Sequence, residues 1–289
     1  MILATQTETL ARRFGVFRAV EILCGAGYDA IDLSFFGDLS FATGENAAEN
    51  AKRLLQIAGQ HNVIFTQAHA PFGGGYPNYN EHIVPCFPQV FAFAEALGVR
   101  QIIVHPVQWG RYYGREKELF AYNLDFYRSL VPLLEGKKLK IALENMWQCN
   151  PVSGIIVDDI LANPQELADM YDALDDPAHF TVCLDVGHVA LCNREPQDAI
   201  RLLGHDRLGA LHVHDVDYRA DLHTLPGLGR INWHAVTDAL ATIDYRGEFT
   251  FEADSFLGGF DDAFLPTAAH FMQERGRELV GWIEKKQGK

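Results

Sequence analysis

The chain has 289 residues, and 48% of them are hydrophobic, which is enough to bury the core of one large α/β domain or two smaller ones. Its formal net charge of −14 opposes a nucleic-acid partner, because such binders usually carry a basic face. The 5 cysteines form no CxxC pair, which favours a reducing, cytoplasmic setting. No apolar run approaches the roughly 18 residues of a membrane span, so we expect no membrane partner.

Short β-rich apolar runs alternate with longer stretches of helical period along the whole chain, as in βα units with parallel strands. The predicted strands are 2–5, 30–35, 63–69, 101–105, 140–145, 181–185, 209–215 and 248–254. Repeats of about 36 residues fit a single (β/α)8 TIM barrel over residues 1–289. No linker or low-complexity tract marks a second domain.

A histidine or a carboxylate stands at the carboxyl end of most of these strands. The residues are His69, His105, Glu144, Asp185, His212 and Glu252. In a barrel the strand ends surround one axis, so these side chains converge, whereas in an open sheet they are spread along an edge. The chain has no GxGxxG after the first strand and no GxxxxGK[ST], which disfavours a doubly wound nucleotide-binding fold.

Polar strand ends also have structural explanations. Asp185 alone is equally a helix cap, and His69 alone is a hydrogen-bonded structural histidine. As a set, buried carboxylates and imidazoles are costly unless they are paired or bind a cation. Three carboxylates and one imidazole suit one divalent ion, Mn²⁺, Zn²⁺, Co²⁺ or Mg²⁺. The four candidate ligands are Glu144, Asp185, His212 and Glu252.

Four segments carry a resemblance to a known family. In this order and spacing, ALENMW, CLDVGH, LHVHD and FEAD resemble the xylose isomerase-like TIM-barrel superfamily, and LPGLGRINW resembles the turn before its seventh helix. Its members include sugar isomerases, ketose 3-epimerases, inosose dehydratases and the endonuclease IV nucleases (AP endonuclease family 2). The resemblance implies the same four metal ligands. It favours His212 over His214, because the family's ligand lies three residues before an acidic or polar residue.

The resemblance also implies chemistry at a sugar carbonyl. In the epimerase branch the glutamates that match Glu144 and Glu252 exchange the substrate proton, and the histidine that matches His188 contacts a substrate oxygen. Proton removal beside a carbonyl leaves an enediolate, which a chelated cation stabilises. We therefore expect a metal-dependent isomerase or epimerase that acts on a sugar or sugar derivative. The expected substrate-binding residues are His69, His105, His188, Trp147 and His223, and further loop aromatics that suit stacking on a sugar are Phe72, Tyr76, Trp109 and Tyr112.

Two alternatives stay open at this stage. A keto-sugar or inosose dehydratase or lyase shares the enediolate step. An endonuclease IV-like tri-zinc phosphodiesterase uses more ligands, and Asp221 and His223 match its additional positions. The ketose 3-epimerase pattern itself is broken by Asn150 in place of a glutamate and by Tyr218 in place of an arginine, so the sugar is not assigned. The oligomeric state also stays open, a homo-oligomer included.

Overall fold

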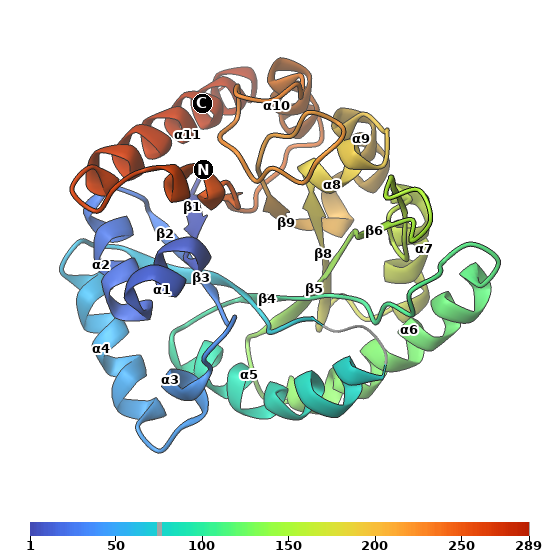
Figure 1. The fold of residues 1–289 in the computed structure, drawn as a ribbon, viewed down its shortest axis with the longest axis horizontal. Coiled ribbons are helices and arrows are strands. Elements are labelled where there is room, and N and C mark those ends of the chain that lie inside the picture. Colours follow the sequence, from blue (N-terminus) through green and yellow to red (C-terminus); the bar gives the residue numbers. More distant parts are fainter. Residues whose placement is uncertain (74–76, 289) are drawn as a thin grey trace.

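The structure is a computed structural model that describes residues 1–73 and 77–288. Its strands are β1 (Leu3–Gln6), β2 (Ala30–Ser34), β3 (Ile64–His69), β4 (Gln101–Val104), β5 (Lys140–Glu144), β6 (Trp147–Cys149), β7 (Ile156–Asp158), β8 (Phe180–Asp185), β9 (Leu208–His212) and β10 (Phe249–Phe251). Eight of them form a parallel sheet in the order β10-β1-β2-β3-β4-β5-β8-β9. The two edges meet where Val213 N–H donates to Thr250 O (2.9 Å) and Glu252 N–H donates to Val213 O (3.1 Å). The predicted (β/α)8 barrel is therefore confirmed (Figure 1).

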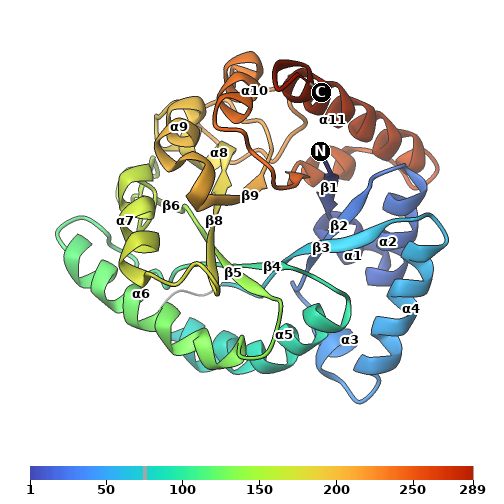
Figure 2. The ribbon, with the colours of Figure 1, turned by 180° about the vertical axis from the view of Figure 1, so that it is seen from behind.

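Helices form a ring around this barrel, as both faces of the molecule show (Figures 1 and 2). They are α1 (Glu8–Phe14), α2 (Val16–Gly25), α3 (Ser40–Thr43), α4 (Ala47–Gly59), α5 (Phe87–Ala96), α6 (Glu116–Leu130), α7 (Pro164–Leu174), α8 (Val186–Leu191), α9 (Pro196–Arg207), α10 (Trp233–Thr242) and α11 (Leu265–Lys286), with short helical turns η1 (Tyr79–Ile83), η2 (Val84–Cys86), η3 (Val131–Leu133) and η4 (Asp254–Gly259). Within the described ranges, none of them combines the length and the apolarity that crossing a membrane requires.

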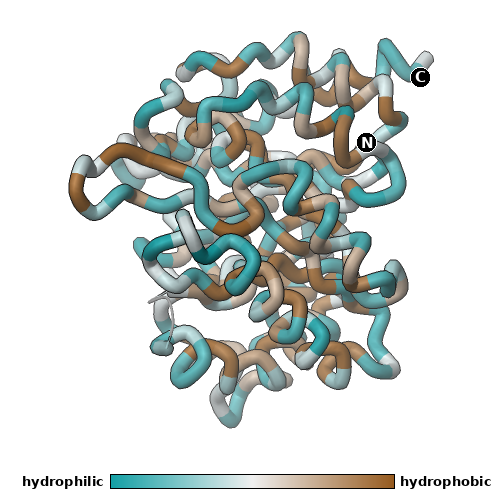
Figure 3. Tube along the Cα trace, turned by 90° about the vertical axis from the view of Figure 1, so that its right-hand side faces the viewer, coloured by the Kyte–Doolittle hydropathy of each residue, from teal (hydrophilic) through white to brown (hydrophobic). Residues whose placement is uncertain are grey.

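The strands are buried on both faces, because side chains fill the barrel on one side and helices cover the other. All six positions of β8 are buried, for example. Figure 3 shows the consequence along the chain, where apolar stretches alternate with polar ones.

Two predicted strands, 209–215 and 248–254, extend three residues past the observed carboxyl ends, whereas the others differ by at most one residue at either end. β9 ends at His212 and β10 spans only Phe249–Phe251, so Asp215 and Glu252 lie just beyond the sheet. The chain leaves the sheet after β9 because the Asp215 carboxylate accepts hydrogen bonds from Gly227 N–H (2.7 Å) and the Trp233 indole (2.8 Å). These bonds fold the LPGLGRINW segment back over the strand end. The antiparallel hairpin of β6 and β7 was not predicted, since each strand has only three residues.

The closing helix α11 provides a test of packing against the barrel. A Cβ on Gly276 would lie 2.6 Å from Leu3 Cδ1 and 2.8 Å from Phe251 Cε2, whereas a Cβ on Gly281 meets nothing within 4 Å. We expect Gly276→Ala to lower the free energy of unfolding by about 1–3 kcal/mol, because overpacking forces both side chains to move. Gly281→Ala, in the same helix, should raise it by about 0.5–1 kcal/mol. Urea unfolding of both variants measures the difference, and equal effects would contradict this packing.

Candidate active site

The four predicted metal ligands meet at one end of the barrel. Glu144 ends β5, Asp185 ends β8, His212 ends β9 and Glu252 follows β10. All four side chains are buried, and one ligand atom from each lies within 4.8 Å of the others. Parallel strands of a barrel all point their carboxyl ends to the same rim, which is why residues up to 108 positions apart in the chain come together.

Glu144 is at the centre of this group. Its Oε1 lies 2.6 Å from His212 Nδ1, and its Oε2 lies 2.8 Å from His105 Nε2 and 3.5 Å from His69 Nε2. Burial raises the pKa of Glu144, but the histidines around it, His212 foremost, hold that pKa well below its ordinary value. In the described part of the chain, every ion-pair partner of this carboxylate is a histidine, so no lysine or arginine compensates the buried charge.

His212 is oriented from both sides of its ring. Nδ1 faces Glu144 and also Glu252, whose Oε2 is 3.2 Å away, while Nε2 lies 3.2 Å from Asp32 Oδ2. Asp32 in turn accepts a hydrogen bond from Gln67 Nε2 (2.7 Å). A carboxylate behind a histidine in this way fixes the ring and the tautomer that presents Nδ1 to the cluster.

Asp185 serves as a helix cap and as a member of the cluster at once. Its Oδ1 accepts a hydrogen bond from the backbone N–H of His188 (2.6 Å) and so caps the first turn of α8. The same carboxylate lies 3.0 Å from His214 Nε2. The Asn145 side chain donates to Asp185 O (3.0 Å) and accepts from Asp185 N (2.8 Å), which locks the strand end in place. The two interpretations of Asp185 from the sequence are therefore not exclusive.

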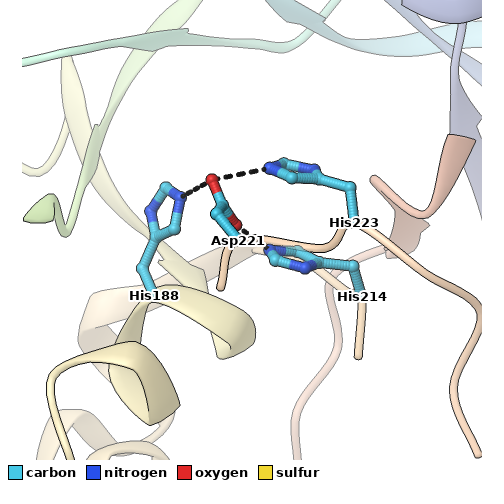
Figure 4. Close-up of side chains that lie close together, drawn as sticks. All are labelled: His188, His214, Asp221 and His223. Atoms are coloured by element: carbon cyan, nitrogen blue, oxygen red, sulfur yellow. Dashed lines mark hydrogen bonds and ion pairs between the residues drawn. The ribbon is translucent and has the colours of Figure 1, made fainter. Parts of the chain in front are cut away.

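A second cluster lies beside the first and consists of His188, His214, Asp221 and His223 (Figure 4). Asp221 Oδ2 lies 3.1 Å from His223 Nε2 and 3.9 Å from His188 Nε2. The rings of His214 and His223 stack with centroids 4.0 Å apart. Asp221 Oδ1 and His214 Nδ1 are buried without a hydrogen-bond partner among the described residues. Burial raises the pKa of Asp221, but the surrounding histidines lower it to about 2.

The predicted substrate-binding aromatics separate into two groups. Phe72 is 42% exposed and its ring lies 4.5 Å from that of His105, and Trp147 lies 6.3 Å from His188, so both border the clusters. Tyr112 instead is buried and donates to Glu166 (2.9 Å). Trp109 packs on Tyr122 and Arg115. Tyr76 lies outside the described residues.

The two departures from the ketose 3-epimerase pattern have structural roles of their own. Asn150 Oδ1 accepts the backbone N–H groups of Val152 (2.9 Å) and Ser153 (3.1 Å), so it shapes the turn between β6 and β7. Tyr218 is half-buried and adopts a left-handed backbone with φ of 66°, and the neighbouring Arg219 is exposed. Neither position therefore supplies the group that this branch uses.

Three residues of the site were not assigned from the sequence. Gln6, the last residue of β1, donates to Glu252 Oε1 (2.6 Å). Asn145 braces Asp185, and His214 joins the second cluster. Gln6 and Asn145 stand at strand ends like the other site residues, but a neutral amide at such a position does not by itself indicate a metal or catalytic site. The place of His214 depends on the loop that returns through Asp221, which no local pattern encodes.

Comparison with known proteins places the chain in a family. The family described as xylose isomerase-like TIM barrel matches residues 20–273. The chain belongs to this family. A protein of Methanocaldococcus jannaschii with no described activity is 26% identical over 215 residues, which are 71% of this chain and 69% of that one. A D-psicose 3-epimerase of Enterocloster bolteae is 31% identical over 117 residues, which are 39% of this chain and 36% of the epimerase.

Two solved structures share the fold of this chain. A D-tagatose 3-epimerase-like protein superposes with a TM-score of 0.74 at 19% identity and covers 99% of both chains. The IOLI protein, solved with a bound zinc atom, superposes with a TM-score of 0.73 at 16% identity, again over 99% of both chains. At these identities the likeness concerns the fold alone.

Proposed function

We propose that this protein is a divalent-metal-dependent isomerase or epimerase of a sugar or sugar derivative. The observation that carries the proposal is the convergence of Glu144, Asp185, His212 and Glu252, whose ligand atoms lie within 4.8 Å of one another in a buried site. Three carboxylates and one imidazole are the donors that Mn²⁺, Zn²⁺, Co²⁺ or Mg²⁺ accept. The epimerases among the relatives and the zinc bound by the IOLI protein support the same assignment.

The residues of the site have distinct roles in this proposal. Glu144 and Glu252 take the proton from the carbon beside the carbonyl and return it. Burial raises the pKa of each glutamate, but His212 holds both pKa values well below the ordinary value. Both side chains are therefore ionised and can act as bases. A bound cation supplies the positive charge that stabilises the enediolate oxygens. His188 and Trp147 position the sugar, and Phe72 covers His69 and His105. These side chains also exclude water from the reacting carbon.

Metal loading tests the first half of the proposal. After chelation and dialysis, adding Mn²⁺ or Zn²⁺ to about 100 times its Kd should stabilise the fold by about 2.7 kcal/mol, which raises Tm by roughly 5–10 °C. Asp185→Asn should lose this shift. Asp159→Asn, which changes a carboxylate that is equally buried but bonded to Gln108, should keep it. Elemental analysis without bound metal, together with an unchanged Tm, would contradict the proposal.

Proton exchange tests the second half. Keto- and aldo-sugars incubated with the metal-loaded protein in deuterated water should gain deuterium at the carbon beside the carbonyl, which NMR detects before any product is identified. Loss of water from the sugar in the same spectra would instead indicate the dehydratase or lyase, which shares the enediolate step. No exchange in any sugar would count against both.

The second cluster favours one further candidate. Asp221 and His223 face His188 and His214, and Asp221 Oδ1 and His214 Nδ1 have no hydrogen-bond partner among the described residues, as in a site for additional metal. With these residues the chain could hold three ions, as the endonuclease IV-like phosphodiesterase does. The net charge of −14 opposes binding to DNA. The number of ions per chain and cleavage of abasic-site DNA separate the two functions, and we expect no cleavage.

A further inference from the structure

A cavity of about 440 Å³ lies beside the candidate active site, between α1 and the segment that follows β2. Its volume falls in the range of small-molecule sites. The aromatic part of its lining consists of Phe17, Phe36 and Phe41. Ala11 on α1 also lines the cavity and is half-buried, and its small side chain fills little of the cavity. None of the residues that form the two metal-ligand clusters lines this cavity.

The cavity and the strand-end clusters share walls. Phe36 lines the cavity, and its ring lies 4.7 Å from the ring of His69. Ser34, another lining residue, pairs in register with His69 across β2 and β3. On the other side, α1 begins two residues after Gln6, whose side chain donates to Glu252. The cavity therefore adjoins the strand ends on the side of His69 and Gln6, next to the carboxylates Glu144 and Glu252.

The polar groups of the cavity define what would fill it. Ser34 is 4% exposed, and its hydroxyl finds no hydrogen-bond partner among the described residues, so it is a buried donor and acceptor available to a ligand. Among the described lining residues, Arg12 is the single cation and is paired with Glu8, while Asp38 adds a second carboxylate. The excess of carboxylates over cations in the lining opposes the binding of a phosphate and suits hydroxyl groups, which donate to carboxylates.

The three phenylalanines complete the match. Aromatic rings pack against flat, apolar faces, and a pyranose ring carries such a face formed by its C–H groups, together with hydroxyls at its edge. We infer that the cavity binds a second, neutral sugar ring, so that the substrate is a keto-sugar that carries a glycosyl substituent rather than a free or phosphorylated monosaccharide. This inference rests on the proposed sugar isomerase or epimerase function.

Matched ketoses test it. Fructose and its glycosylated forms lactulose, turanose and isomaltulose, which differ in the linkage, are compared by deuterium incorporation with the Mn²⁺-loaded protein. We expect at least one disaccharide to exchange with kcat/KM about tenfold or more above that of fructose, because binding of a remote ring contributes to the reacting step.

Two variants locate the second ring in the cavity. Ala11→Phe fills the cavity and should remove the advantage of the disaccharide, about tenfold, while the kcat/KM of fructose is unaffected. Ser34→Ala should lower the disaccharide's kcat/KM about threefold or more without lowering Tm, since its hydroxyl is unpartnered in the free protein.

A matched control uses the same substitution elsewhere. Ala92→Phe places an equal ring in an exposed groove of α5 on the outside of the barrel, and it should change neither substrate. If fructose exchanges as fast as every disaccharide, or if Ala11→Phe slows fructose and the disaccharide equally, the inference of a second ring is overturned. The proposed function still stands in both cases. Exchange in none of the four ketoses would overturn the second ring as well, while the proposed function is decided separately by the wider screen of keto- and aldo-sugars.

Discussion

Glu144→Gln should lower the rate of proton exchange by about 10²–10⁴-fold at saturating metal. The amide keeps the size of the side chain but cannot accept the proton, and it removes the charge that His212 and His105 face at 2.6 and 2.8 Å. Glu252→Gln should have a similar effect, because both carboxylates are needed to move the proton from the substrate and back to it. Deuterium incorporation into the best sugar, followed by NMR, measures both.

A second buried glutamate provides the control for this prediction. Glu248 lies next to the opposite end of β10 and accepts a hydrogen bond from Gln101 Nε2 (2.9 Å), with 7% of its surface exposed. Burial raises the pKa of Glu248, so a neutral amide is tolerated there. Glu248→Gln should retain an exchange rate within about threefold of the wild type, as expected of a site away from the chemistry. If Glu144→Gln with a full complement of metal exchanges as fast as Glu248→Gln, then Glu144 is not the base.

The fold and the main cluster follow from short patterns of the sequence. Parallel strands in βα units place all carboxyl ends on one rim, so the sequence alone predicts that Glu144, Asp185 and His212 lie close together. His212 and His214 are two residues apart and both join the site, because Val213 still pairs with Phe251 after β9 ends and keeps the alternation of side chains.

What the sequence could not predict depends on loops and on close approach. His214 reaches the second cluster only because the segment after Asp215 folds back and brings Asp221 and His223 over it, and this course is fixed by hydrogen bonds between residues up to 18 positions apart. The hairpin of β6 and β7 is too short for a periodic pattern. The cavity beside α1 depends on the relative placement of two loops, which no motif records.

Gly187→Ala should destabilise the protein and displace His214. Gly187 lies inside α8, where alanine is the better helix former by about 1 kcal/mol. A Cβ at this position, however, would lie 2.1 Å from Cε1 and 2.4 Å from Nε2 of the His214 ring. The ring is fully buried between Asp185 and His223 and cannot yield without losing both contacts. We expect a loss of about 2–3 kcal/mol and a Tm lower by roughly 5–10 °C.

A double variant separates this clash from a general loss of helix α8. In Gly187→Ala/His214→Ala the ring that meets the new methyl group is absent, so the two effects should be strongly non-additive, with a coupling of about 1–3 kcal/mol in the direction of rescue. Additive losses would mean that alanine disturbs α8 itself and that the two residues do not pack as described. If metal also binds at the second cluster, Gly187→Ala should reduce the number of ions per chain while the cluster around Glu144 keeps its own. The glycine of the DVGH segment would then be required for the position of His214, in addition to the roles of Asp185 and His188 on either side of it.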